Sequence, residues 1–153
     1  MAKQDRKNPV LYKDRTKIFL NILFRWGPVV LWMVFIFLGS ASSTPYQFLP
    51  SNGSKMIAKV GGNKVTERDI LGTIGHSLEY AVLAVLACYA VIGKNQLRVW
   101  NIGLVAIFAG IYAFSDEFHQ LFVPGRLFEL RDLGLDAVGI LLGFLAYGAY
   151  GIF

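Results

Sequence analysis

The segment that decides the fold of this chain runs from Val99 to Asp132 and reads VWNIGLVAIFAGIYAFSDEFHQLFVPGRLFELRD. Its first half, Val99–Phe114, is a nearly continuous apolar run, and its second half carries seven ionisable side chains between Asp116 and Asp132. Ionisable groups at a membrane boundary lose solvation, so they normally have partners or a function. The segment therefore predicts a helical membrane protein with its functional site where a span meets water.

The composition of the whole chain is that of a small integral membrane protein. Hydrophobic residues make up 55% of the 153 residues and charged residues only 16%, and the mean hydropathy is +0.50. The net charge of +5 does not indicate nucleic-acid binding, because much of it comes from a basic cluster ahead of the first apolar segment: Lys3, Arg6, Lys7, Lys13, Arg15 and Lys17. Such a cluster is a topology signal and a contact for anionic membrane lipids. The one cysteine, Cys88, excludes an internal disulfide.

Four apolar segments are long enough to cross a membrane. We predict an all-α membrane protein with transmembrane helices at 18–39, 74–92, 99–114 and 133–153. The third is short, so it should continue as helix through 116–121. Arg25 interrupts the first span, and its side chain should extend to the membrane interface. No signal-peptide cleavage site stands out, so we treat the first segment as a retained anchor.

The distribution of Lys and Arg predicts the orientation of the spans. The basic segment 1–17, which we expect to be loose or interfacial, is assigned to the cytoplasm. The membrane domain then spans 18–153, with both termini inside the cell. The polar cluster and the loop at about 41–70 lie outside. In that loop, Met56–Val60 and Lys64–Thr66 flank a Gly-Gly-Asn turn typical of a short hairpin, and Thr66 resembles a cap for a helix that begins near Glu67.

Helical spacing gathers the polar residues of three spans onto shared faces. His76, Glu79 and Tyr80 share one face of the second span. The candidate site comprises His76, Glu79, Tyr80, Asp116, Glu117, His119, Gln120, Arg126, Asp132 and Asp136. Glu117 lies about 100° around its helix from Asp116, so it should reach a different partner. Gly139 and Gly143 allow another helix to approach the fourth span closely, which is also compatible with a homo-oligomer.

Glu79 is the most unusual residue, because it lies inside an apolar helix. A carboxylate there needs a cation, a hydrogen-bond donor or a bound proton. Arg126 and Arg131 are the available cations, and a turn at Pro124-Gly125 would return Arg126 over the end of the third span. The plain alternative is a structural ion pair that fixes helix packing. Acids at helix ends that are simply solvated, and an exposed His119, are further alternatives.

The cluster has acceptable metal-ligand types but no close spacing of the His-Glu-x-x-His kind. Gly-rich phosphate loops are also absent. We therefore predict no metal and no cofactor.

These motifs resemble those of the VanZ-like family. The resemblance rests on Asp116–Arg126 (DEFHQLFVPGR), the following Arg131-Asp132-Leu133, the second-helix stretch Gly75–Ala81 (GHSLEYA) and the Ser-rich exit of the first span, Gly39–Pro45 (GSASSTP). It covers roughly residues 26–148. It implies that 18–153 is a VanZ-like four-helix membrane domain in the bacterial inner membrane, part of the cell envelope. Similar proteins are linked to teicoplanin-type glycopeptide resistance. One departure is Asp136, where the family often carries Asn.

Three functions compete. The first is a protein that binds or handles an outer-leaflet lipid or lipopeptide, with Arg126 and Arg131 for phosphate. The second is a membrane enzyme acting on a lipid headgroup or lipid-linked precursor, with Glu79 or Asp116 as general base, His76 or His119 as its acid or base partner and Arg126 as phosphate clamp. The third is an accessory structural subunit of a membrane complex.

Overall fold

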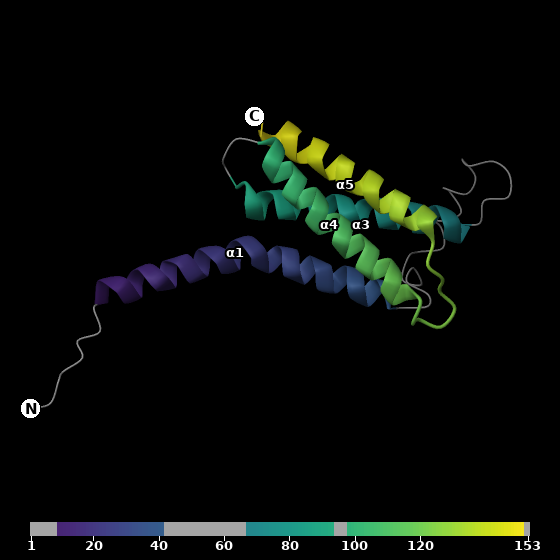
Figure 1. Ribbon diagram of the computed structural model, residues 1–153, viewed down its shortest axis with the longest axis horizontal. Coiled ribbons are helices and arrows are strands. Elements are labelled where there is room, and N and C mark those ends of the chain that lie inside the picture. Colours follow the sequence, from purple (N-terminus) through teal and green to yellow (C-terminus); the bar gives the residue numbers. More distant parts are fainter. Residues whose placement is uncertain (1–8, 42–66, 94–97, 152–153) are drawn as a thin grey trace, which may run out of the picture.

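The structure is a computed structural model that describes residues 9–41, 67–93 and 98–151. It consists of four helices, α1 (Pro9–Ser40), α3 (Glu67–Val91), α4 (Val99–Gln120) and α5 (Leu130–Gly151), shown in Figure 1. Within these ranges no residue belongs to a strand. All four helices are long and apolar enough to cross a membrane. The predicted all-α architecture of an integral membrane protein is confirmed, while the predicted hairpin at 56–66 lies outside the described residues.

The helix boundaries follow the local sequence signals. α3 begins at Glu67, as predicted, and α4 continues through the polar residues to Gln120. α1 begins already at Pro9, inside the segment expected to be loose or interfacial. Proline suits the first position of a helix, because its missing N–H would have no partner there. α3 gives way to a turn at Gly93, whose φ of 61° suits glycine at a helix C-terminus.

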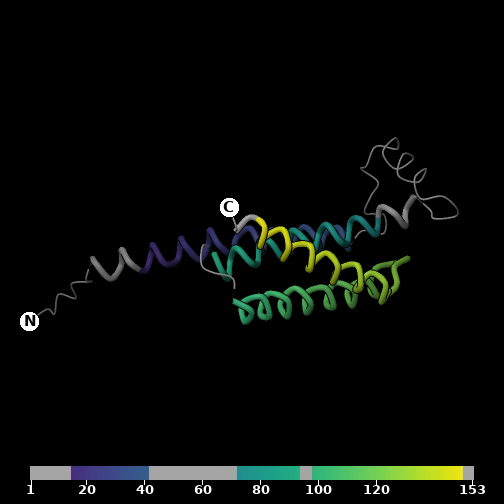
Figure 2. The backbone as a smooth tube through the Cα atoms, turned by 90° about the horizontal axis from the view of Figure 1, so that it is seen from above, coloured from purple at the N-terminus to yellow at the C-terminus, as the bar shows by residue number. Residues whose placement is uncertain are grey.

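The four helices alternate in direction. α1 and α4 run one way and α3 and α5 the other (Figures 1 and 2). α3 is the central helix, since it packs against all three others and forms the largest interface of the bundle with α5. Small residues make that interface possible: a Cβ added at Gly139 would overlap the backbone of Ser77, and one at Gly143 would meet the backbone of Ala81. The predicted close approach at these glycines is therefore confirmed, and it occurs within one chain.

The apolar core lies along α3. Its main cluster of buried residues comprises Val29, Ile36, Tyr80, Leu83, Ala84, Ala90, Ala109, Ala113 and Ile140. The opposite side of α1 exposes large apolar side chains such as Phe24 and Leu31, as a lipid-facing helix should. Arg25 donates to the carbonyl of Tyr89 near the end of α3, so the cation of the first span meets a helix C-terminus, where positive charge is favourable.

This arrangement places the predicted site residues at one end of the bundle, except Tyr80, which belongs to the apolar core. The last turns of α1 and α4 and the first turns of α5 lie at this end (Figure 1), and α3 contributes His76 and Glu79 from its middle turns. All four helices thus contribute side chains to one region near the ends of the candidate membrane spans.

Candidate functional site

His76 is held between two carboxylates of α5. Its Nδ1 lies 2.9 Å from Asp136 Oδ1 and its Nε2 lies 3.4 Å from Asp132 Oδ2. His76 and Asp136 are buried, whereas Asp132 keeps 20% of its side chain exposed. An imidazole donates to carboxylates on both sides only when both ring nitrogens carry a proton. The pair of aspartates, one helical turn apart, therefore favours a histidinium ion and ties α5 to α3.

Asp136 is the position at which the chain departs from its resemblance to the VanZ-like family. A carboxylate there serves as the acceptor for His76 Nδ1, so the residue makes a charged contact rather than donating a hydrogen bond. Its second oxygen, Oδ2, is buried and has no hydrogen-bond partner among the residues that the structure describes.

Glu117 and Asp116 face different neighbours, as their angular separation predicts. The side chain of Glu117 is completely buried, and its Oε2 accepts a hydrogen bond of 3.1 Å from the backbone N–H of Glu129. Glu129 precedes α5 and its carbonyl accepts from the N–H groups of Asp132 and Leu133. Glu117 thus anchors the N-terminus of α5, where a negative charge is also favourable.

Arg126 returns over the end of α4, as predicted. The turn Val123–Arg126 has Pro124 at its second position and Gly125, with a φ of 81°, at its third, the arrangement of a type II turn. The guanidinium then donates from Nε (3.1 Å) and Nη2 (2.7 Å) to Gln120 Oε1. This fork fixes the orientation of the cation and leaves its Nη1 donors for another group.

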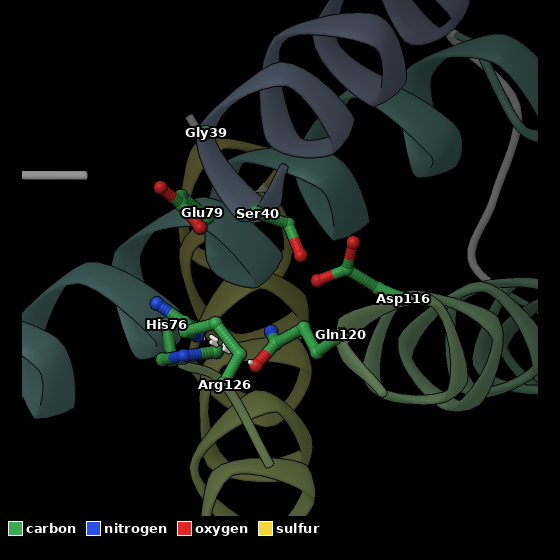
Figure 3. Close-up of a pocket in the computed structure, with 7 residues that line it drawn as sticks. All are labelled: Gly39, Ser40, His76, Glu79, Asp116, Gln120 and Arg126. Atoms are coloured by element: carbon green, nitrogen blue, oxygen red, sulfur yellow. Dashed lines mark hydrogen bonds between the residues drawn. The ribbon is translucent and has the colours of Figure 1, made fainter. Parts of the chain in front are cut away.

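A small cavity lies between these elements. It is partly open, has a volume of about 20 Å³, and is lined by Gly39, Ser40, His76, Glu79, Asp116, Gln120 and Arg126. The Ser40 hydroxyl points toward the Asp116 carboxylate (Figure 3). A cavity of this size has room for about one water molecule, so only a small group can enter while the side chains keep these positions.

The contribution of α1 to the cavity was missed by the spacing argument. Gly39 and Ser40 line it, and Ser40 is 8% exposed. The Ser-rich end of the first span was the sequence feature that could have indicated this contribution. Spacing within one helix, however, cannot show that the end of α1 packs against α4.

Two predicted partners of Glu79 are engaged elsewhere. Arg126 is held by Gln120, and Arg131 donates to the Thr73 hydroxyl at 2.9 Å. Within the described residues, no ion pair of Glu79 shorter than 4.0 Å occurs. The plain hypothesis of a structural Glu79–Arg pair is therefore wrong for the described part of the chain, and Glu79 instead lines the cavity together with Arg126.

Two other candidates lie away from the cavity. Tyr80 belongs to the apolar core, and its ring lies 6.3 Å from that of Tyr112. His119 packs against Phe37, with ring centroids 4.4 Å apart. Neither lines the cavity. Helical spacing predicts which residues share a face, but it does not predict which neighbouring element covers that face.

The site is rich in negative charge. Its carboxylates are Glu79, Asp116, Glu117, Asp132 and Asp136. Across the described ranges, the ion pairs that they form within 4.0 Å are those with His76. Buried carboxylates that outnumber their cations must be neutralised by bound protons or by a further cation.

Comparison with known proteins gives one match. The family model described as VanZ/LLP1 matches residues 25–151, which include every residue of the site. No curated protein and no solved structure matches the chain.

Proposed function

The chain belongs to the VanZ/LLP1 family, and we propose that it binds the anionic headgroup of an outer-leaflet lipid or lipid-linked molecule at the cavity edge. The observation that carries the proposal is the fixed guanidinium of Arg126 at a partly open cavity near the end of the spans. Arginine suits phosphate because its planar fork matches two phosphate oxygens.

The surroundings of Arg126 support a ligand that stays in the membrane. Large apolar side chains around the turn are exposed: Phe118, Leu121, Phe122, Leu127 and Leu130. They offer contacts for acyl chains while Arg126 takes the headgroup. Because the cavity holds only a small group, the headgroup would sit at its rim. Glu79 and Asp116 would then contact an amine or hydroxyl of the ligand.

The proposal includes a location and a phenotype. The site would face outward from the bacterial inner membrane, with both termini cytoplasmic. Ligand handling there would alter access of teicoplanin-type glycopeptides to the cell envelope, as the family resemblance implies.

Removing the Arg126 guanidinium should abolish lipid binding without unfolding the protein. We expect phospholipids or lipid-linked cell-wall precursors to raise the melting temperature of wild type in detergent, and Arg126→Ala to lose that shift, because the anion contact is gone. Glu79→Gln should retain anion binding but change the preference among headgroups. Arg131→Ala is the matched control: the same residue type at the same end, bonded to Thr73 and outside the cavity lining.

Two results would contradict this proposal. One is a folded Arg126→Ala protein that binds every lipid as wild type does. The other is a failure of both Arg126→Ala and Glu79→Gln to fold, which would mean that the polar residues only stabilise helix packing and that the function depends on a partner protein.

In a teicoplanin-sensitive host, wild type should raise the teicoplanin concentration needed to stop growth, and Arg126→Ala should not.

Cysteine labelling tests the orientation. The native Cys88 is completely buried, so an engineered cysteine should dominate the labelling. Glu129→Cys is exposed at the site end and Arg98→Cys at the opposite end. In intact cells, a membrane-impermeant maleimide should label Glu129→Cys, and Arg98→Cys only after permeabilisation. The reverse pattern would place the site on the cytoplasmic side.

A further inference from the structure

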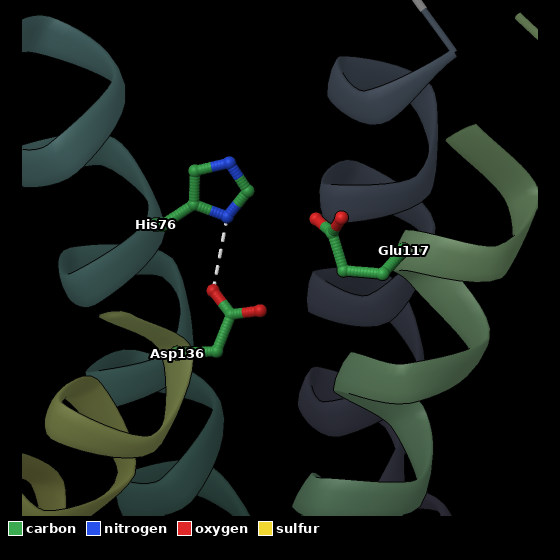
Figure 4. A group of neighbouring side chains, drawn as sticks. All are labelled: His76, Glu117 and Asp136. Atoms are coloured by element: carbon green, nitrogen blue, oxygen red, sulfur yellow. Dashed lines mark hydrogen bonds and ion pairs between the residues drawn. The ribbon is translucent and has the colours of Figure 1, made fainter. Parts of the chain in front are cut away.

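Three buried side chains from three different helices converge beside the cavity. His76 on α3, Glu117 on α4 and Asp136 on α5 each offer one ligand atom, and these atoms all lie within 4.8 Å of one another. Figure 4 shows the imidazole and the two carboxylates directed toward a common space. All three residues are more than nine-tenths buried.

Two of these residues present polar atoms that nothing in the described protein satisfies. Glu117 Oε1 and Asp136 Oδ2 are buried and have no hydrogen-bond partner. Both side chains are completely buried. A buried acceptor left unpaired is destabilising, and more so when it is charged, so native proteins rarely keep one without a reason. The other carboxylate oxygens are engaged: Glu117 Oε2 accepts from Glu129 N–H, and Asp136 Oδ1 pairs with His76 Nδ1. Glu117 Oε1 and Asp136 Oδ2 are therefore available for a ligand.

We propose that His76, Glu117 and Asp136 bind a divalent transition-metal ion, with Zn²⁺ as the first candidate. One imidazole and two carboxylates form a ligand set that suits zinc and its neighbours, whereas Mg²⁺ and Ca²⁺ prefer oxygen alone. Three protein ligands leave one position open for water or another ligand, as in catalytic rather than structural zinc sites. The ion would also offset part of the excess negative charge of the site.

Asp132 fits this site as a positioning residue. Its Oδ2 lies 3.4 Å from His76 Nε2, on the side of the ring opposite Asp136. Metal-bound histidines commonly donate their second ring N–H to a carboxylate, which fixes the ring and strengthens the bond to the metal. On binding the ion, His76 would release the Nδ1 proton that it now shares with Asp136, bind the ion through Nδ1 and donate from Nε2 to Asp132. Sequence spacing could not indicate this site, because Glu117 follows His76 by 41 positions and Asp136 follows Glu117 by 19.

The test is zinc binding to the full chain, purified in detergent without a polyhistidine tag and stripped with a chelator. Metal content, competition with a chromophoric zinc chelator and the visible spectrum of the Co²⁺ form are measured. We expect one zinc per chain. Glu117→Gln, whose amide oxygen can still accept from Glu129 N–H, and Asp136→Asn should lose it. Asp132→Asn should weaken binding about 10–100-fold.

Two controls separate this site from adventitious binding. His119→Ala removes the other histidine, and Glu129→Gln removes an exposed carboxylate while keeping its backbone N–H. Both should bind zinc as wild type does. Absence of stoichiometric zinc in folded wild type, or unchanged binding in folded Glu117→Gln and Asp136→Asn, would overturn the proposal. It does not rest on the proposed lipid function, since Arg126→Ala should keep its zinc.

Discussion

Replacing His76 by alanine should lower the free energy of unfolding by about 3–5 kcal/mol, the range found when one member of a buried ion pair is removed. The physical reason is the charge that remains. Asp136 loses its contact of 2.9 Å and Asp132 its contact of 3.4 Å, so two carboxylates stay at a membrane boundary without the cation between them. The measurement is unfolding in detergent followed by circular dichroism, after chelator treatment so that a bound metal does not contribute.

His119→Ala is the matched control, since the chain has two histidines. Its ring packs on Phe37 at the edge of α1, and losing one aromatic contact of this kind costs about 0.5–1.5 kcal/mol beyond the area that it buries. An equal decrease in the free energy of unfolding for the two variants would contradict the interpretation that His76 forms a stabilising ion pair. A double-mutant cycle of His76→Ala with Asp136→Ala should give a clear coupling energy, because the two groups are in contact.

A single methyl group at Gly139 should have the second large effect. The added Cβ of Gly139→Ala would overlap the backbone of Ser77, and backbone cannot rotate away as a flexible side chain can. α3 and α5 would have to move apart, which weakens the packing between them. Overpacking of this kind costs about 1–3 kcal/mol. The same detergent unfolding experiment measures it.

Gly134→Ala tests whether position or residue type is responsible. Gly134 lies in the same helix, and a Cβ there would meet nothing within 4 Å. Alanine is a better helix former than glycine by about 1 kcal/mol, so this variant should be neutral or more stable. Equal destabilisation at both positions would show that helix propensity, and not the contact with Ser77, explains the loss at Gly139.

The proposed lipid site and the proposed metal site use different residues at the polar end of the bundle. Arg126 and Gln120 form the anion contact at the rim, whereas His76, Glu117 and Asp136 form the buried ligand set. The groups are neighbours, since His76 also lines the cavity. A folded Arg126→Ala protein that loses lipid but keeps zinc, together with a folded Glu117→Gln protein that loses zinc, would separate them.

The membrane architecture follows from the amino-acid sequence alone, because the length and polarity of a segment specify whether it crosses a bilayer. The sequence also predicted local features that depend on a few neighbouring residues. The turn at Pro124-Gly125 returned Arg126 to the end of α4, and Glu117 faced away from Asp116 toward α5. The close approach at Gly139 was predicted as well, though not which helix would fill it.

Which charged side chains become partners depends on how the helices pack. An ion pair of Glu79 with an arginine was one alternative. Instead Arg126 binds Gln120 and Arg131 binds Thr73, while His76 contacts the two aspartates of α5. Helical spacing fixes the face on which a residue lies, but the rotation and height of one helix against another depend on packing along the whole interface. The contact of Gly139 with Ser77 sets that height for α3 and α5, and it brings His76 beside Asp136.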